Sequence, residues 1–466
     1  MSEYITIQVG QCGNQIGSEF WPLVLQEYGI TREKSKSKPP EQSTTFNSFF
    51  QIHPDYKGES FNTIQDLVDS EVKARTILVD METSVVSRYK NSYLRDIFDE
   101  EYIIVHYPGS GNNWAEGFCH YGPRFEEKIL YSIRKAVENC DSLHGFLLMY
   151  SLGGGTGSGV GSYILKLLDD HFPHIDRFVT CVYPIGTEDV ITCPYNMALA
   201  TKELIEHASC VIPVENRALI DIVKKQASNT HSIDTMSFVA GCKPFQDMNS
   251  IIVNMLLNLT SGSRFTGDLN VDLSELVTNM VPFPNLPFLS CGLSPLTITS
   301  SNNKINLEEI FLQSSNLNNQ LIKINASNNQ LPLTLGTTLL ARGDLFTISD
   351  MRSFVDRLQR KNCFTSWSKQ AIKIGMCGVA PIGHRASMMT LFNTTAINGL
   401  LGKVKSDFTK LYQKRAHVHH YLQVAGFEEI FFEECLDVLC ECIKSYQDIE
   451  NRSMENIKVP RLIPEN

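Results

Sequence analysis

A glycine-rich segment with the sequence GGGTGSG, residues 153–159, carries the residue types in this chain that are best suited to chemistry. It follows an apolar run at 146–149 and precedes apolar residues at helical spacing, which predicts a turn between a buried strand and a helix N-terminus. Glycines let backbone N–H groups approach an anion, and the helix dipole adds partial positive charge. With the hydroxyls of Thr156 and Ser158 as further donors, this turn predicts a polyphosphate site.

Two familiar phosphate-binding loops do not describe this segment. No Lys follows the glycines, as GxxxxGK(S/T) requires, and residues 157–161 match GxGxxG only in part. A nucleotide held here without a lysine depends on backbone amides, a helix dipole and a metal ion. This argues against kinases of the usual kind and against dehydrogenases. A dinucleotide-dependent oxidoreductase stays as an alternative that rests only on a glycine-rich turn in an α/β fold.

The elements that must position this turn alternate between strands and helices from Ser2 to about Cys242. Strands separated by helices predict an α/β fold with a mostly parallel, doubly wound sheet. Ligands bind outside the carboxyl ends of such strands, so the turns at Gly10, Asp80 and Gly153 should converge on one crevice. The apolar strand runs are residues 4–9, 77–79, 102–105, 146–149 and 178–182.

The remainder of the chain divides into two further units. A helix over about 245–261 is apolar around most of its circumference, which predicts a buried helix between two domains. The length of 466 residues suits about three domains. We therefore expect a nucleotide-binding domain at 1–242, the core helix with a second α+β domain at 243–400, and C-terminal helices at 401–466.

Polar inserts interrupt this scheme at 31–45, 226–237 and 300–330. The first is rich in Lys, Ser and Pro, and the third is rich in Asn. Each predicts a mobile surface loop.

Composition excludes several classes of function. A net charge of −10 argues against nucleic acid as a partner. No signal segment and no run of the ~18 apolar residues that span a bilayer is present, so we expect no membrane partner. The 13 cysteines then predict reduced thiols in an intracellular protein. The histidines at 417, 419 and 420 favour packing or a polar surface over metal binding, because structural zinc needs a closed set of four ligands.

Four further segments, together with the glycine-rich turn, closely resemble the tubulin family in the same order. They are GQCGNQIG at 10–17, GSGNNWA at 109–115, NVDLSE at 270–275 and NMVPFP at 279–284. The resemblance runs from Ser2 to about Pro460. Within the family the chain looks most like the epsilon-tubulins, through FVTCVYP at 178–184, DVITCPYN at 189–196 and AHVHHYLQV at 416–424. Delta-tubulin or another divergent type is the alternative.

This resemblance implies GTP and Mg²⁺ as cofactors. It places Asp189 at the ribose, with Asp80 and Glu82 facing the waters of Mg²⁺. Where beta-tubulin has a Glu near the ribose, this chain has Cys193, so one ribose contact is expected to be absent. The other residues implied to hold nucleotide are Gln11, Cys12, Gln15, Asn112, Gly153, Gly154, Gly155, Thr156, Gly157 and Ser158, with Asn216, Phe245 and Asn249 for the guanine.

Glu275 is the implied catalytic residue, acting in trans. It lies at the far end of the buried helix from the glycine loops, so it cannot reach its own site. It matches the alpha-tubulin glutamate that orients the attacking water, and in a head-to-tail stack it would act on the nucleotide of a neighbouring subunit. The alternative is a structural tubulin that keeps GTP as a fixed folding cofactor without hydrolysis.

The resemblance also implies partners and a location. Other tubulins, delta or alpha/beta, and centriolar proteins are the expected partners, in the cytoplasmic cytoskeleton at centrioles and basal bodies with triplet microtubules. The segment 447–466 is nearly neutral, whereas alpha- and beta-tubulins end in acidic tails. The insert at 300–330 falls where those tubulins carry their loop for lateral contacts. Both departures argue against a role in the bulk microtubule lattice.

Overall fold

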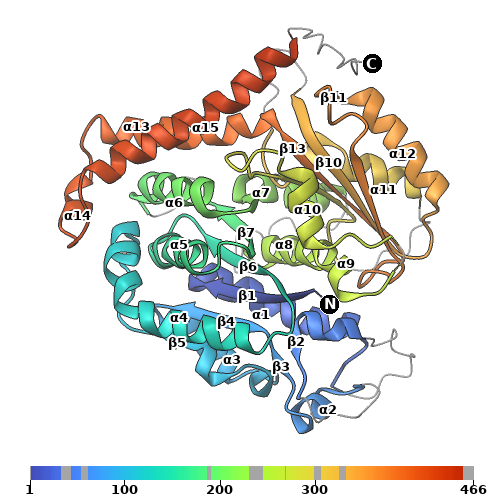
Figure 1. The fold of residues 1–466 in the computed structure, drawn as a ribbon, viewed down its shortest axis with the longest axis horizontal. Helices are drawn as coiled ribbons and strands as arrows, with labels where there is room; N and C mark the ends of the chain where they lie inside the picture. Colours follow the sequence, from blue (N-terminus) through green and yellow to red (C-terminus); the bar gives the residue numbers. More distant parts are fainter. Residues whose placement is uncertain are drawn as a thin grey trace, which may run out of the picture.

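The computed structural model describes residues 2–32, 44–53, 61–185, 190–229, 245–267, 269–298, 306–324 and 332–454. These residues form a six-stranded sheet, a five-stranded sheet and a group of C-terminal helices that lies across the first sheet's helices (Figure 1). The predicted Asp189 contact and most of the inserts at 31–45 and 226–237 lie outside the described residues.

The first sheet is entirely parallel in its strand pairs, as the alternation of strands and helices predicts. Its strand order is β5-β4-β1-β6-β7-β8, so the chain winds outward in both directions from the centre. The strands are β1 Glu3–Val9, β4 Thr76–Asp80, β5 Ile103–Val105, β6 Leu143–Ser151, β7 Asp176–Tyr183 and β8 Cys210–Glu215. The helices that follow them along the chain are α1 Gly10–Glu27, α3 Thr83–Lys90, α4 Gly122–Glu138, α5 Gly161–His171, α6 Cys193–His207 and α7 Asn216–Asn229.

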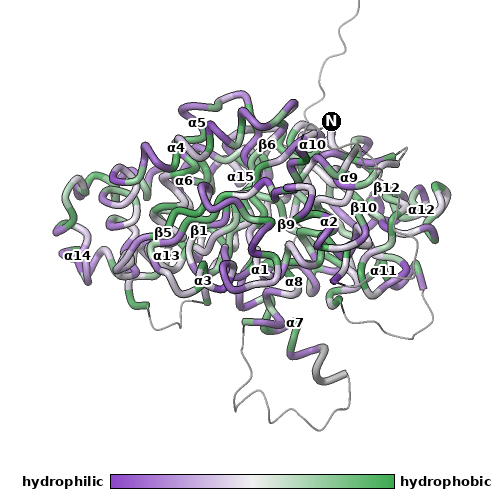
Figure 2. Tube along the Cα trace, turned by 90° about the horizontal axis from the view of Figure 1, so that it is seen from below, coloured by the Kyte–Doolittle hydropathy of each residue, from purple (hydrophilic) through white to green (hydrophobic). Residues whose placement is uncertain are grey.

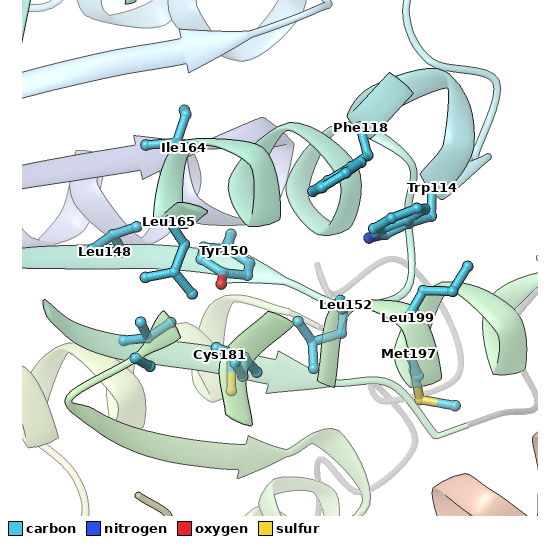
Figure 3. Close-up of a cluster of buried hydrophobic side chains, with 14 of the residues drawn as sticks. Trp114, Phe118, Leu148, Tyr150, Leu152, Ile164, Leu165, Cys181, Met197 and Leu199 are labelled. Carbon is cyan, nitrogen blue, oxygen red and sulfur yellow. The ribbon is translucent and has the colours of Figure 1, made fainter. Parts of the chain in front are cut away.

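Strand residues alternate between two hydrophobic cores, one on each face of this sheet. Ile5 and Ile7 of β1 join the core shared with α4, α5 and α6, whereas Tyr4 joins the core shared with α1 and α8. Figure 3 shows the first core, where Leu148 and Tyr150 of β6 lie under Ile164 and Leu165 of α5. Side chains on both faces are buried because helices cover both, which explains the near-continuous apolar strand runs.

The predicted core helix is α8, Gln246–Leu259, and it is buried along nearly its whole length. It packs against α1 and α7 on one side and against β10 and β13 of the second sheet on the other. Its polar Asn254 donates to the carbonyl oxygen of Pro295 at 3.0 Å, and Ser387 donates to Asn258 at 2.7 Å. These hydrogen bonds let an asparagine-bearing helix lie in the core without unpaired polar groups.

The second sheet is mixed, with β10 pairing parallel to β11 and β12 and antiparallel to β13. Its strands are β9 Ser290–Ser294, β10 Leu333–Arg342, β11 Cys363–Phe364, β12 Ile372–Cys377 and β13 Ser387–Thr394. Short helices α9 Ser261–Arg264 and α10 Leu273–Met280 precede it, and α11 Leu307–Ser314 and α12 Ile348–Lys361 lie beside it (Figure 1). This arrangement is the expected α+β unit.

The prediction that 300–330 is a mobile surface loop is wrong for residues 306–324. Helix α11 starts there, with the Asn306 side chain accepting a hydrogen bond from the N–H of Glu308. Phe311 is buried and stacks on Phe354 with ring centroids 4.4 Å apart, and Leu321 is also buried. The asparagine-rich composition hid these anchors, because a few buried aromatic and aliphatic residues suffice to fix a short segment.

A buried ion cluster joins the first sheet's α1 to the second sheet. Glu27, the last residue of α1, forms an ion pair with Arg264 at 2.6 Å and accepts a hydrogen bond from Arg342 at 2.9 Å, and all three side chains are almost fully buried. Both guanidinium groups also donate to the carbonyl oxygen of Leu257, and the Phe265 ring lies against both. Such a cluster depends on its one carboxylate to compensate two cations.

The C-terminal helices α13 Asn398–Tyr412, α14 Val418–Leu422 and α15 Ile430–Met454 follow the two predicted helical patterns, with α14 as an addition. Helices α13 and α15 pack on α6, while α14 lies at one end of the molecule (Figure 1). Tyr195 of α6 contacts Phe408, Tyr421 and Phe432 in a buried aromatic cluster. By contrast, α7 projects from the body of the molecule (Figure 2).

Candidate functional site

A cavity of about 420 Å³ lies at the carboxyl ends of the parallel strands, where the sequence predicted a crevice. Its walls come from the turns after β1, β4, β5, β6 and β8 and from the first turn of α8. Nearly all of the predicted site residues meet here although they are spread over more than two hundred positions. They are Gln11, Cys12, Gln15, Asp80, Glu82, Asn112, Gly153, Gly154, Gly155, Thr156, Gly157, Asn216, Phe245 and Asn249.

Two predicted positions are placed differently. Ser158 is fully buried and its hydroxyl donates to the carbonyl oxygen of Gly154, so it stabilises the glycine-rich turn and does not face the cavity. Cys193, at the start of α6, is also buried; a Cβ added to Gly153 would lie 3.5 Å from its sulfur. Cys193 therefore supports the turn from beneath and does not line the cavity.

Several lining residues escaped the sequence interpretation. Ser110 and Gly111 sit inside a segment singled out as a motif, and Ser151 ends the strand before the glycine-rich turn. Their position directly before or within the loops was the available signal. Val190 and Met248 carry no such signal, because apolar side chains beside a site resemble ordinary core residues.

Close packing fixes the glycine-rich turn. Gly10 has φ +69°, and a Cβ there would lie 2.9 Å from the backbone nitrogen of Gly157. A Cβ on Gly155 would lie 2.5 Å from the hydroxyl oxygen of Ser110. At Gly154, in contrast, an added Cβ would meet only the Asn112 side chain, at 3.7 Å. The turn is thus rigid on its inner side and open toward the cavity, as a cradle for an anion requires.

Two π-helical turns lie against each other, one directly before α4 and one directly before α5. They are Glu116–Tyr121 and Thr156–Val160. A Cβ on Gly159 would lie 2.4 Å from the carbonyl oxygen of Trp114, and one on Gly117 would lie 2.4 Å from the carbonyl oxygen of Gly155. The two turns therefore touch backbone to backbone. Such turns are frequent at functional sites because they widen the helix locally.

Asp80 is a buried carboxyl that needs a partner. One of its oxygens accepts from the N–H of Glu82 at 3.2 Å, while the other, Oδ2, is buried without a hydrogen-bond partner among the described residues. Burial raises the pKa of Asp80 to about 7. Glu82 is more exposed and packs against Gly109. An unpaired carboxylate oxygen beside an anion cradle fits a hard cation such as Mg²⁺, which takes few carboxylates and keeps several waters.

Substituting Asp80→Asn is expected to lower GTP affinity about tenfold when Mg²⁺ is present, because the amide keeps the shape but removes the charge that would hold the ion. In EDTA the variant and the parent protein should bind GTP alike. Titration of a fluorescent GTP analogue with and without Mg²⁺ measures both. Asp69→Asn, at an exposed carboxylate bonded to Gln65, is the control. An unchanged dependence on Mg²⁺ in the Asp80 variant would contradict the assignment.

The other end of the cavity is lined by amides and an aromatic ring. Asn216 begins α7 and Asn249 lies in the first turn of α8; each side chain is largely buried. Phe245 is 53% exposed, and its carbonyl oxygen accepts from the N–H of Asn249 at 2.8 Å. Buried amides with an adjacent aromatic face suit a purine base, because amides can pair with its exocyclic groups and the ring can stack on its face.

Glu275 lies at the opposite edge of the first sheet. Asp272, which caps α10, accepts hydrogen bonds from Ser2 and Tyr4 at the amino end of β1, whereas the cavity lies beyond the carboxyl end of that strand. Seven extended residues span roughly 23 Å. The side chain of Glu275 is 45% exposed and forms an ion pair with Lys373 of β12. It therefore cannot reach the cavity of its own chain.

Comparisons with known proteins match both halves of the chain. Residues 3–224 match the GTPase domain of the Tubulin/FtsZ family, and residues 284–406 match the tubulin C-terminal domain. The chain is 40% identical over 481 residues to the tubulin epsilon chains of Mus musculus and Homo sapiens, covering 99% of each. It is 28% identical to the tubulin beta-1 chain of Colletotrichum gloeosporioides, over 98% of this chain and 97% of that one. The chain belongs to the tubulin family.

The expected fold is thereby confirmed, and this tubulin is a GTP-binding protein of the cytoskeletal type that resembles epsilon chains. A GTPase domain over the first sheet removes the oxidoreductase alternative. Among the described helices, none is long and apolar enough to cross a membrane.

Potential metal ligands elsewhere in this tubulin have other partners. Within the described ranges, Glu203, Glu206 and His207 bring three ligand atoms together, but the Lys202 ammonium already lies 2.9 Å from Glu206 and 3.2 Å from Glu203. The predicted histidines contact one another, His419 tilted against His420 with ring centroids 4.0 Å apart and His417 stacked on His420 at 5.9 Å. Both groups are explained by packing and ion pairing.

Proposed function

We propose that this tubulin is of the epsilon type, a structural component of centrioles and basal bodies that supports triplet microtubules. Its GTP hydrolysis would be completed at head-to-tail contacts with other tubulins. The proposal of hydrolysis at head-to-tail contacts rests on one observation. Within a single chain, the cavity lies at one edge of the first sheet and Glu275 lies at the other. A stack that repeats this polarity brings the two together.

Within the cavity, each group has a proposed role. Gln11, Cys12 and Gln15 contact phosphates and base, Asn112 and residues 153–157 hold the phosphates, and Asp189 contacts the ribose. Asn216, Asn249 and Phe245 recognise guanine, while Asp80 and Glu82 hold Mg²⁺ through its waters. The bound ion neutralises charge on the phosphates. Glu275 orients the attacking water on the nucleotide of the adjoining subunit.

The proposed partners and organisation follow from the same resemblance. Delta-tubulin, alpha/beta-tubulin and centriolar proteins are the proposed partners, in the cytoplasm at the centriolar cytoskeleton. The chain would act as three units, a GTP-binding domain at 1–242, a core helix with an intermediate domain at 243–400, and C-terminal helices at 401–466.

A second candidate is a structural tubulin that binds GTP without turnover, delta-like or of another divergent type. One contact favours it: the ion pair between Glu275 and Lys373 occupies the carboxylate that hydrolysis requires. The buried Cys193 in place of a ribose contact agrees with a nucleotide whose exchange differs from that of beta-tubulin.

Nucleotide content and turnover of the purified chain separate the two candidates. We expect bound guanine nucleotide, negligible hydrolysis by the chain alone, and hydrolysis that rises on adding delta- or alpha/beta-tubulin. Chromatography of the released nucleotide and phosphate release measure these quantities. Tightly held GTP that never turns over with any partner would overturn the assembling GTPase in favour of the structural tubulin.

A further inference from the structure

The amide of Asn196, in the first turns of α6, uses its full hydrogen-bonding capacity at the edge of the cavity. Its Nδ2 donates to the carbonyl oxygens of Asn112 at 2.8 Å and Gly153 at 2.9 Å. Its Oδ1 accepts from the N–H of Trp114 at 2.9 Å and from the hydroxyl of Tyr421 at 2.6 Å. The side chain is fully buried and does not line the cavity.

The two carbonyl groups that Asn196 holds belong to the two loops that face the proposed phosphates. Asn112 follows β5 and Gly153 follows β6, two strands of the first sheet that are not neighbours. Asn112 has φ +54°, a left-handed conformation that its surroundings must maintain. A second donor, the hydroxyl of Thr192, reaches the Asn112 carbonyl at 3.0 Å. The hydroxyls of Ser110 and Thr156 join the two loops directly at 2.8 Å, and the bonds from α6 add a second link that fixes their spacing.

Tyr421 connects this clamp to α14 at the end of the molecule. Its side chain is fully buried, and its hydroxyl oxygen also lies 3.4 Å from the Thr192 carbonyl. Helix α14 and the loop of Asn112 are the two sides of a second cavity of about 680 Å³. The Asn113 side chain also donates to the carbonyl oxygen of His420 at 3.0 Å. The phosphate-facing loop is therefore bonded to α14 directly and through Asn196.

We propose that Asn196, itself oriented by Tyr421, is a positioning residue that sets the spacing of the two phosphate-facing loops, which makes α14 part of the nucleotide site. This inference rests on the proposed GTP site. It predicts that losing the clamp weakens phosphate contacts selectively, because the residues proposed to recognise guanine come from α7 and the start of α8, outside the clamp.

The test is the affinity of the parent protein and four variants for fluorescent GTP, GDP and GMP, together with their melting temperatures. Asn196→Ala removes all four hydrogen bonds and should lower GTP affinity about tenfold or more, with a smaller loss for GDP and the smallest for GMP. Tyr421→Phe removes only the hydroxyl that orients Asn196 and should lower GTP affinity about threefold to fivefold, graded in the same way. Tyr195→Phe is the matched control, because its hydroxyl bonds the Ala416 carbonyl at 2.8 Å in the same aromatic cluster.

Thr192→Val keeps the test decisive if Asn196→Ala does not fold, because Thr192 lies near the surface and its substitution removes one bond to Asn112. It should show the same graded loss. Equal losses for all three nucleotides, or a lowered melting temperature with unchanged GTP affinity, would overturn the positioning role. Absence of GTP binding by the parent protein would instead overturn the proposed function.

Discussion

Replacing Glu275 by Gln is expected to lower partner-dependent GTP hydrolysis about 10²–10⁴-fold, the usual contribution of a carboxylate that positions or activates an attacking water. GTP binding to the chain's own cavity should not change, because Glu275 lies at the other edge of the sheet. The free energy of unfolding of the variant should differ from that of the parent protein by less than about 1 kcal/mol, since the ion pair of Glu275 with Lys373 is partly exposed to solvent. Phosphate release in co-assembly with delta- or alpha/beta-tubulin measures the effect.

A matched control exists on α11. Glu308 also lies in the first turn of a short helix and pairs with a base, Arg357, at 2.9 Å. Glu308→Gln should leave hydrolysis at the parent rate. Hydrolysis by the Glu275 variant that equals the parent rate under conditions where both assemble would refute catalysis in trans. Lys373→Ala removes the partner of Glu275 within the chain. The rate of partner-dependent GTP hydrolysis should therefore rise or stay the same in this variant.

The second large effect concerns stability. Glu27→Gln should destabilise the protein by about 3–5 kcal/mol, because it leaves the buried cations of Arg264 and Arg342 without a compensating charge. The free energy of unfolding of a whole domain is only ~5–15 kcal/mol, so the expected loss is a large fraction of the total stability. The midpoint of urea unfolding, followed by intrinsic fluorescence, measures the change.

An exposed pair supplies the comparison for Glu27. Asp407→Asn breaks a surface contact with Lys410 at 3.1 Å and should cost less than about 1 kcal/mol. If the Glu27 variant unfolds at the same urea concentration as the Asp407 variant, the buried cluster does not hold α1 against the second sheet. Nucleotide should be saturating in both measurements, because bound ligand stabilises the folded state.

Strong local patterns in the sequence were sufficient to predict much of this fold. Apolar strand runs and helical spacing located five of the six strands of the first sheet and the helix α8, whereas β8 was missed. The parallel pairing followed from the alternation of strands and helices. The convergence of the turns at Gly10, Asp80 and Gly153 could be predicted because the carboxyl ends of parallel strands share one edge. The roles of these residues still rest on resemblance to other tubulins.

What sequence reasoning could not supply were contacts between distant segments. Asn196 occurs within a motif, yet its bond to Tyr421 joins residues 225 positions apart. The ion pair of Glu275 with Lys373 spans 98 positions. The helix α11 was misread because composition averages over a segment, whereas burial of Phe311 depends on a partner ring from α12. Pairings of this kind appear only once the chain is folded.

The abutting π-helical turns at Gly117 and Gly159 have a consequence for how this protein can change over evolutionary time. Neither glycine can acquire a side chain while the other backbone lies against it, since the nearest atoms to an added Cβ are backbone atoms at 2.4 Å. Changing one first would push the helix of the glycine-rich turn away from its neighbour. We therefore expect related chains to keep these two glycines as a pair.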